Sequence, residues 1–444
     1  AGERPTNVRW CMLALLMAFA ALAHFNRISI SVAGTEHIMD EYSLDENQMG
    51  NVYSAYLFVY TLCMLPGGWL IDRFGPKAAL MLLGFGSAIL VPLTGLTSLA
   101  TSGAILLALC VVRGLLGVVS TPMHPGAARA VSFWMPIQER GVSNGLVTAA
   151  AVGGIAVTYI VFGALMDLFG WPGAFLVSGV ATLALTLVWT FVATDRPFQH
   201  SLVNHAEREL IAAGDPARAA HTFAAANPGE MEAGAGTATA GQQGGLIGWI
   251  LRNRSLVLLS LSYAAYSYYQ YLFFYWIQYY FDKIMQLGTE DGRFYATLPN
   301  LAMAVGMVSG GWVSDRIQAR YGGWFGRAAT PFVGMIAGSL LLLAGLARSD
   351  LGWVATCFTL SMGCLGLAES SFWVAGTALG RGRGGFSGAF LNTVGNAGGI
   401  LGTRLSPLFS QYIGWQGGLC LASFVCLVGA ALWWWIDPDE RSGE

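Results

Sequence analysis

The chain has 444 residues, of which 55% are hydrophobic and only 11% are charged. A water-soluble domain of this length does not need so large an apolar fraction, so the lipid bilayer is the expected solvent. The formal net charge of -2 is close to zero, which argues against nucleic acid as a partner.

Continuous apolar stretches of roughly twenty residues recur along the whole chain. Examples are residues 11–23, which continue past Arg27, and residues 78–99 and 174–193. Runs of this length cross a membrane as helices, whereas a membrane β-barrel would show shorter segments of alternating polarity. We count about twelve spans and therefore predict an all-α integral membrane protein.

Basic residues outside the predicted spans are unevenly distributed. Only Lys283, Arg293 and Arg348 fall on one side, whereas most of the 23 lysines and arginines fall in segments that share the other side. The positive-inside rule then places both termini in the cytoplasm, in agreement with an even number of spans. Because arginine exceeds lysine, as in GC-rich bacterial genomes, we expect a multi-pass protein of a bacterial inner membrane.

One long polar stretch, residues 195–246, divides the chain into two parts. Its Ala, Gly, Glu and Arg content without apolar periodicity predicts a partly disordered cytoplasmic linker. We expect residues 1–194 to form an N-terminal six-helix bundle and residues 247–437 a C-terminal one. Residues 438–444 would be a cytoplasmic tail, and the protein would be a monomer.

The two predicted bundles carry repeated motifs. Residues 67–73 (GGWLIDR) recur as residues 310–316 (GGWVSDR), each at the expected cytoplasmic end of a second helix. The fifth helices end in FGW at 169–171 and IGW at 413–415. Repeated halves of a membrane protein place a transport site between them, near the middle of the bilayer.

These motifs resemble those of a known family. Gly68-x-x-x-Asp72-Arg73-x-Gly75-x-Lys77 is similar to the loop signature of the major facilitator superfamily. Within that superfamily, the anion:cation symporter family is resembled at PGGW (66–69), RGLLG (113–117), PG (125–126), FW (133–134) and NTVGNAGG (392–399). The family includes hexuronate, galactonate, sialin and vesicular glutamate transporters. The resemblance implies two pseudo-symmetric six-helix bundles that move a small organic anion by alternating access, coupled to protons and without a cofactor or metal.

Three arginines, Arg27, Arg113 and Arg404, lie within predicted spans, where a guanidinium is costly and indicates function. Arg27 and Arg113 lie midway along helices that face the central cavity of the implied fold, where two guanidinium groups could hold a carboxylate. Members of the resembled family use arginines at these two positions for the substrate anion or for coupling. The alternative is structural ion pairing, but the first-half spans contain no acid except Asp72 and Asp167 at helix ends.

Glu369 is the only acidic residue that we place near a bilayer midplane, where a carboxyl group can bind and release a proton. Proton-linked members of the resembled family carry acids at the positions of Asn26 and Ser120. Aligning GLLG at 114–117 with GCLG at 363–366 makes Ser120 the counterpart of Glu369. We hypothesise that Glu369 couples transport to protons; the alternative is a permanent ion pair with Arg404.

Histidines offer a second protonation site. His24 lies almost one turn before Arg27 on the same helix face, so it could either carry a proton or hydrogen-bond the substrate. His124, beside Pro125, is expected at a kink nearer the cytoplasm and is given no strong functional role.

Aromatic and amide side chains complete the predicted site. Residues 262–271 (SYAAYSYYQY) are too rich in hydroxyl groups for a lipid-facing surface alone, although an aromatic belt at the membrane interface explains some tyrosines. The expected substrate contacts are Tyr60, Tyr266, Tyr269, Gln270, Trp373, Asn392 and Asn396.

The duplicated loop motifs are predicted to act in gating. Asp72, Arg73, Lys77, Asp315 and Arg316 would lie where cytoplasmic loops meet helix ends, where their charges can hold that side closed. Exposed ion pairs are individually weak, which suits contacts that form and break.

Other functional classes fit less well. The chain has no nucleotide-binding motif, which disfavours an ATP-driven pump, and no nucleophile with a base or metal cluster, which disfavours an enzyme. A duplicated gate motif favours a carrier over a channel. The main alternative is a facilitator or cation-coupled carrier of a neutral or zwitterionic metabolite, with Glu369 binding an amine.

Overall fold

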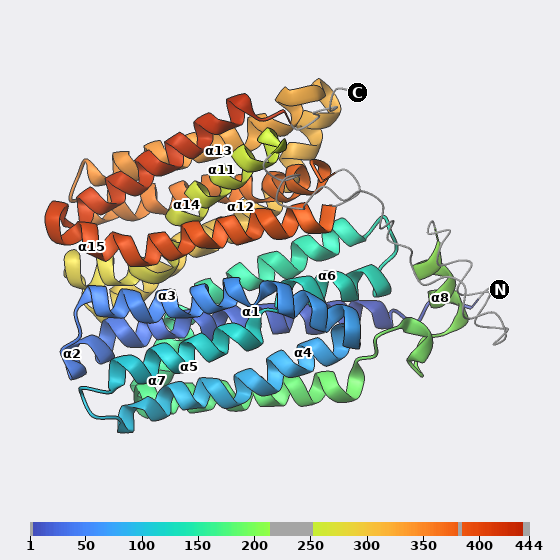
Figure 1. The fold of residues 1–444 in the computed structure, drawn as a ribbon, viewed down its shortest axis with the longest axis horizontal. Coiled ribbons are helices and arrows are strands. Elements are labelled where there is room, and N and C mark those ends of the chain that lie inside the picture. Colours follow the sequence, from blue (N-terminus) through green and yellow to red (C-terminus); the bar gives the residue numbers. More distant parts are fainter. Residues whose placement is uncertain (1–2, 214–251, 381–383, 438–444) are drawn as a thin grey trace.

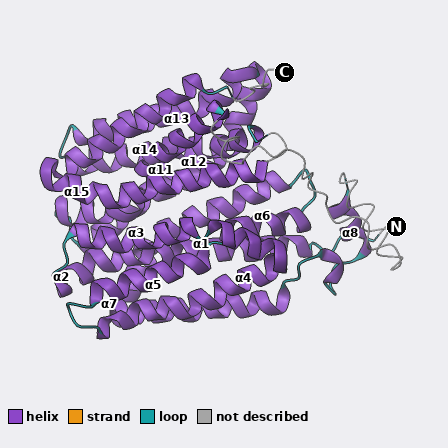
Figure 2. Cartoon of the chain, viewed as in Figure 1, coloured by secondary structure: helices purple, strands orange, loops and turns teal. Residues whose placement is uncertain are grey.

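The computed structural model describes residues 3–213, 252–380 and 384–437. Within these ranges the regular elements are all helices, as Figure 2 shows, so the all-α prediction is confirmed. The predicted tail 438–444 and the linker from residue 214 onward lie outside the described residues.

The helices form two groups that are consecutive in the chain and lie side by side (Figure 1). The first half comprises α1 (Val8–Ala33), the π-helical turn η1 (Gly34–Ile38), α2 (Met39–Tyr42), α3 (Glu46–Leu62), α4 (Met64–Leu96), η2 (Thr97–Leu99), α5 (Ile105–Ser120), α6 (Met123–Trp134) and α7 (Arg140–Val192). Two linker elements, η3 (Pro197–Gln199) and α8 (His205–Ala212), follow. The second half comprises α11 (Arg254–Tyr279), the π-helical turn η4 (Tyr280–Ile284), α12 (Thr289–Tyr321), α13 (Gly323–Leu346), α14 (Leu351–Ala378), α15 (Gly384–Leu432) and η5 (Trp433–Trp435).

Among the described residues, 7 helical segments are long and apolar enough to cross a membrane. Two of them, α7 with 53 residues and α15 with 49, are each long enough for two crossings, since one crossing needs about 20 residues. Each bends sharply at a glycine with positive φ, Gly170 (69°) and Gly414 (70°), a conformation that glycine adopts without strain. These are the paired FGW and IGW positions. α11 with 26 residues and α12 with 33 are each long enough for one crossing but are not among the seven, because they carry more polar side chains, so the number twelve stays a prediction.

Close helix crossings repeat between the halves. A Cβ atom on Gly154 of α7 would lie 2.2 Å from the carbonyl oxygen of Ala21 in α1, and one on Gly398 of α15 would lie 2.0 Å from that of Ala264 in α11. Only glycine permits such an approach, as is common between membrane helices. The pseudo-symmetry predicted from the motifs therefore extends to helix packing.

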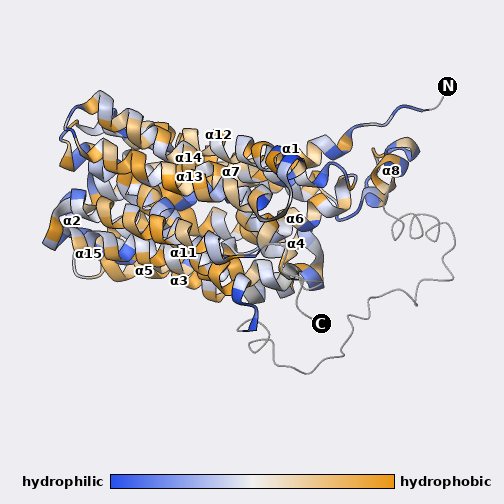
Figure 3. Ribbon diagram, turned by 90° about the horizontal axis from the view of Figure 1, so that it is seen from above, coloured by the Kyte–Doolittle hydropathy of each residue, from blue (hydrophilic) through white to orange (hydrophobic). Residues whose placement is uncertain are grey.

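The halves contact each other mainly through α3 with α15 and α7 with α12, and α1 also contacts α11. Large apolar side chains such as Leu107, Phe191 and Val305 are exposed on the outside of the bundle, and Figure 3 shows the extent of apolar colouring along the helices. An outer surface of this kind suits lipid rather than water.

Candidate functional site

Arg27 lies in the middle of the helix bundle, buried between the two halves. Its Nε donates a hydrogen bond to the hydroxyl of Tyr275 in α11 (3.2 Å). The guanidinium carbon lies 5.1 Å from the ring centre of Tyr56 in α3 and 4.8 Å from that of Tyr271 in α11. Its Nη2 is buried without a hydrogen-bond partner among the described residues. A buried cation with an unused donor is costly unless an anion binds there.

Arg113 in α5 is fully buried and turned toward the backbone of α1. Its Nη1 donates to the carbonyl oxygen of Asn26 (3.0 Å), and its Nη2 donates to that of Arg27. Each terminal nitrogen of Arg113 thus makes one hydrogen bond to a backbone carbonyl, while its guanidinium carbon lies 5.5 Å from the ring centre of Tyr56, the ring that Arg27 also faces. Its Nε is buried without a hydrogen-bond partner among the described residues. In this structure it positions the helix segment that carries Arg27.

A narrow cleft, here called the histidine cleft, lies beside Arg27. It holds about 10 Å³, the space of roughly one water molecule. Its lining residues are Ala23, His24, Arg27, Tyr56, Tyr60, Ser120, Met123 and His124. Two sequence-predicted site residues, His24 and Tyr60, thus lie with Arg27.

His124 is closer to this cleft than the sequence suggested. The chain turns at Thr121 and Pro122 between α5 and α6, which places His124 in the first turn of α6. The rings of His24 and His124 meet edge to face, with centres 5.2 Å apart. The position of Pro125 indicated a kink, but a contact between helices far apart in sequence has no local signal.

Glu369 lies within the second half and is buried. Its Oε1 accepts hydrogen bonds from the hydroxyl of Tyr263 (2.8 Å) and from Nε1 of Trp373 (2.9 Å). The alternative ion pair with Arg404 is not formed, since Arg404 instead donates to Oδ1 of Asn47 in the first half (3.2 Å). Glu369 thus forms no ion pair among the described residues.

The remaining predicted contacts of the second half fall into different surroundings. Asn392 and Asn396 both approach the sulfur of Met64 in the first half at 3.7 Å. Oδ1 of Asn396 also accepts a hydrogen bond from the hydroxyl of Tyr271 (3.3 Å). Tyr271 in turn contacts Arg27, so it connects Asn396 to the arginine. This pair connects the two halves at the site.

Three other predicted residues lie deeper in the second half. Tyr266 stacks on Tyr263, with ring centres 5.7 Å apart, next to the Glu369 cluster. Gln270 contacts the sulfur of Met303 at 3.7 Å. Tyr269 is misplaced by the sequence prediction: its hydroxyl bonds to Ser361 of α14, because this face of α11 packs inside its own half.

The end of the molecule opposite the chain termini, here called the far end, is closed by ion pairs. Arg293 of α12 donates from Nη2 to Oε2 of Glu36 (2.6 Å) and from Nη1 to Oδ2 of Asp167 (2.5 Å). Glu36 and Asp167 belong to η1 and α7 of the first half, so one guanidinium joins the halves. The sequence placed Arg293 on this side but gave no partner for it.

Further contacts close the far end. Lys283 donates to Asp40 (3.0 Å), and Gln278 donates to Glu36 (2.6 Å). The hydroxyl of Tyr279 donates to Glu46 (2.7 Å). All of these join the second half to the first.

The predicted gating residues lie at the opposite end, which Figure 1 shows carrying both termini. Asp72, Arg73 and Asp315 are exposed, and the guanidinium of Arg316 lies 3.6 Å from the ring centre of Trp312 in its own helix. The backbone N–H of Lys77 donates to Oδ1 of Asp195 (2.9 Å), a partner that the motif did not indicate. Among the described contacts these residues do not join the two halves.

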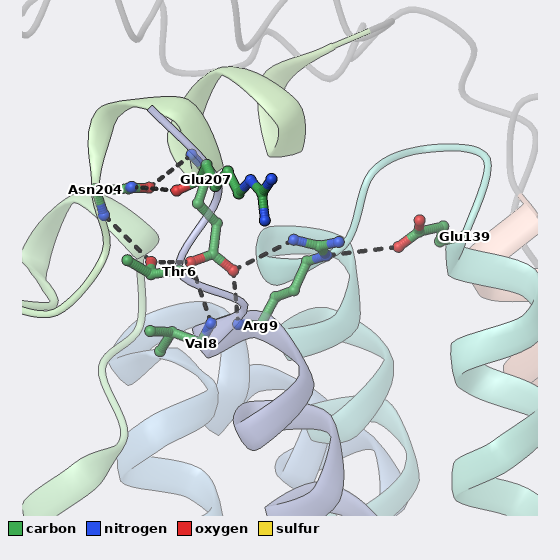
Figure 4. Close-up of polar contacts among 7 residues, drawn as sticks. Thr6, Val8, Arg9, Glu139, Asn204 and Glu207 are labelled. Carbon is green, nitrogen blue, oxygen red and sulfur yellow. Dashed lines mark hydrogen bonds and ion pairs between the residues drawn. The ribbon is translucent and has the colours of Figure 1, made fainter. Parts of the chain in front are cut away.

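The linker helix α8 is attached to the start of α1 through Glu207 (Figure 4). This carboxylate is fully buried and accepts hydrogen bonds from the hydroxyl of Thr6 and from the backbone N–H groups of Val8 (3.1 Å) and Arg9 (3.0 Å). Arg9 also pairs with Glu139 (3.7 Å) at the start of α7. Burial opposes ionisation, but these hydrogen bonds and the charge of Arg9 outweigh it and hold the pKa of Glu207 below its usual range.

Residues 15–403 match the family model of the Major Facilitator Superfamily, and the chain belongs to this family of membrane transporters. It is 29% identical to a probable sulfoacetate transporter of Cupriavidus necator, over 100% of this chain and 98% of that protein. It is 28% identical to a probable galactarate/D-glucarate transporter of Bacillus subtilis, over 93% and 87% of the two chains. A D-galactonate transporter of Escherichia coli is 25% identical over 97% and 95%.

Solved structures confirm the fold. A bacterial homolog of the human lysosomal transporter Spinster, in an inward-facing and occupied conformation, superposes with a TM-score of 0.72 at 15% identity, covering 98% of this chain and 97% of that chain. A peptide transporter in complex with alafosfalin superposes with a TM-score of 0.68 at 14% identity, covering 97% and 96%. The protein is thus a multi-pass membrane transporter and not an enzyme.

Proposed function

We propose that this transporter is a secondary active carrier of a small organic anion, which binds at Arg27 and moves by alternating access. The observation that carries the proposal is the buried guanidinium between the halves, whose Nη2 has no partner among the described residues. Three relatives named as transporters of organic acids support the anionic substrate class.

The surroundings of Arg27 suit a hydroxylated or otherwise polar acid. Tyr60 of the first half lines the cleft with Arg27, and the ring of Tyr271 of the second half faces its guanidinium. The hydroxyl of Tyr271 donates to Asn396, which in turn bonds to Asn392. Because both halves contribute side chains, the substrate binds best to the state in which the halves close around it, and binding shifts the equilibrium toward that state.

The distribution of basic residues predicts that both termini are cytoplasmic, and this orientation tells which side of the membrane the closed end faces. The far end, closed by Arg293, Glu36 and Asp167, then faces the periplasm, and the state is closed to that side. The loop residues Asp72 and Arg73, exposed here, would engage at the cytoplasmic end in the opposite state.

We further propose that Glu369 takes up and releases a proton during the transport cycle. It is buried, and among the described residues Oε2 has no hydrogen-bond partner and no basic side chain forms an ion pair with the carboxyl group. An unpaired carboxyl group in the membrane is expected to be neutral for part of the cycle. The protein would act as a monomer in the bacterial inner membrane.

A thermal-shift screen followed by flux measurement tests the proposed function. The purified protein is heated with sulfoacetate, D-glucarate or D-galactonate, and at least one should raise the melting temperature of wild type but not of Arg27→Gln. Arg404→Gln removes a guanidinium outside the site and should keep the shift. If only amines stabilise the protein, the alternative of a cation-coupled carrier with Glu369 as the amine ligand replaces this proposal.

A further inference from the structure

We infer that His24 and His124 form a single proton-binding dyad in the histidine cleft, which takes up one proton when an anion binds at Arg27. The inference rests on the proposed function, because it needs an anion at Arg27. It adds a protonation site in the first half, separate from Glu369.

The geometry brings two titratable rings from different helices to one small space. His24 belongs to α1 and His124 to α6, and their ring centres are 5.2 Å apart. Nδ1 of His24 lies 3.0 Å from the carbonyl oxygen of Ala20. A carbonyl only accepts hydrogen bonds, so Nδ1 carries the hydrogen in the neutral ring and Nε2 is left as the atom that binds an added proton.

The groups that face the dyad are one cation and several neutral side chains. Arg27 lies on the same helix as His24, Tyr56 and Tyr60 approach from α3, and Ser120 comes from the end of α5. No carboxylate lines the cleft. The charges that act on the two rings are therefore those of Arg27 and of each other.

This arrangement links proton binding to anion binding. With the cleft empty of anion, the fixed charge of Arg27 opposes a second cation beside it. A carboxylate or sulfonate at Arg27 cancels that charge and places negative charge next to the rings, so each ligand favours the other. The proton comes from solvent, forms one N–H bond on the dyad, and returns to solvent when the anion leaves.

The proximity of the rings sets the number of protons at one. Two imidazolium groups in contact would repel each other, while one proton leaves the second ring neutral and able to accept or donate a hydrogen bond. Both rings are only half-buried, so solvent in the cleft can reach them when this side opens. The two histidines therefore act as a unit.

Glu369 does not belong to this unit. Its hydrogen-bond partners, Tyr263 and Trp373, belong to α11 and α14 of the second half. A proton on Glu369 would therefore not be linked directly to the anion at Arg27, and the two sites can be separated experimentally.

The test measures anion affinity and proton uptake together across pH. The probe is whichever of sulfoacetate, D-glucarate or D-galactonate stabilises the wild-type protein most, titrated calorimetrically from pH 5 to pH 8. One linked proton predicts about tenfold tighter binding for each unit that the pH falls, over the range where the dyad is neutral without the anion. Adding the anion in weak buffer should then remove about one proton per site from solution, measured with a pH-sensitive dye.

Substitutions at the histidines test whether these residues bind the proton that is linked to anion binding. His24→Gln and His124→Gln keep hydrogen-bonding capacity but do not titrate, and each should abolish the pH slope and the proton uptake. The double variant should show no further loss. The exposed control His205→Gln should keep both signals, and Glu369→Gln is measured beside it to locate the linked proton. His24→Asn and His124→Asn serve as second variants where a glutamine variant does not fold.

Each contrary result has a definite meaning. If the wild type binds an anion and either histidine variant keeps the slope, the dyad is wrong while the proposed function stands. If Glu369→Gln alone removes the slope, the linked proton belongs to Glu369 and the dyad is again wrong. If no anion stabilises the wild type, the proposed function fails and takes the dyad with it.

Discussion

Arg293 and Glu36 form a bidentate ion pair across the two halves, with Nη2 to Oε2 at 2.6 Å and Nε to Oε1 at 2.8 Å. The carboxylate of Glu36 is only 2% exposed, so the pair is shielded from solvent. A second carboxylate, that of Asp167, contacts the same guanidinium from α7 but is 57% exposed. The buried member is therefore expected to dominate the closure of the far end.

Arg293→Gln should open the far end. Removing the cation leaves the buried Glu36 without a counter-charge, which for buried pairs costs about 3–5 kcal/mol. In a cysteine-free background with Thr35→Cys, which lies buried at this end, labelling by an impermeant maleimide should rise strongly. Asp167→Asn is the matched control: its exposed pair contributes at most about 1 kcal/mol, so labelling should change little. Equal labelling in the two variants would contradict the assignment.

Arg27→Lys should bind the anion poorly although it keeps the charge. Lysine cannot maintain the bond to Tyr275 while facing both Tyr56 and Tyr271, and it offers no planar fork to a carboxylate. We expect at least about a tenfold loss of affinity, or roughly 1.4 kcal/mol, in calorimetric titration. Unchanged affinity would show that the anion binds elsewhere.

Arg113→Lys tests the positioning role described for that residue. One ammonium group cannot replace the two bonds to the carbonyls of Asn26 and Arg27, so the α1 segment should lose rigidity. Hydrogen exchange of the backbone around residues 26–30 should increase. If exchange is unchanged and only anion affinity falls, Arg113 is a direct ligand, as the resemblance implied.

The sequence predicted the class and the repeat, and it directed attention to Arg27, because a charge within an apolar run has few explanations other than function. Arg27 was predicted in this way, His24 from its helical spacing to Arg27, and Tyr60 from the family resemblance. It did not predict the turn of Arg113 toward α1 or the ring contact of His24 with His124. Both contacts depend on the angles at which α1, α5 and α6 cross, and helix crossing angles cannot be predicted from the periodicity of the sequence.

Long-range contacts also explain why the sequence did not predict the partners of several acidic residues near the helix ends. Glu36, Asp167 and Glu207 are acids near helix ends, where most acids are simply solvated. Their roles appear only when a partner far away in sequence is brought close. Tyr269 was misassigned for a related reason, since every face of a tyrosine-rich helix looks equally suited to a cavity.

Glu369→Gln should separate binding from coupling. The glutamine carbonyl can still accept the hydrogen bonds from Tyr263 and Trp373, so the fold should persist. Anion binding should survive, and uptake into proteoliposomes should depend less on a pH gradient than in wild type, because only the proton on the histidine dyad remains linked to the anion. Gradient-driven uptake equal to wild type would remove Glu369 from the coupling mechanism.

Acid should detach α8 from α1. Because the pKa of docked Glu207 is held below that of a free carboxyl, about 4.3, docking is stabilised above that pH and the stabilisation is lost as the pH falls through the docked value. Spin labels at the exposed Glu3 and Glu209 should move apart on acidification. Glu207→Gln should show the longer distance already at pH 7, and an unchanged distance would contradict the role of Glu207.

Helix α1 and the π-helical turn η1 that follows it carry both Arg27 and Glu36. Arg27 and Glu36 are nine residues apart, which in a regular α-helix puts them about half a turn away from each other. The wider turn over Gly34–Ile38 includes Glu36. The side chains of Arg27 and Glu36 both contact α11, at Tyr275 and Gln278. If the anion binds at Arg27 as proposed, a single helix carries both the anion ligand and a contact that fastens the far end, so any rotation of α1 on substrate binding would also strain the contact that must break.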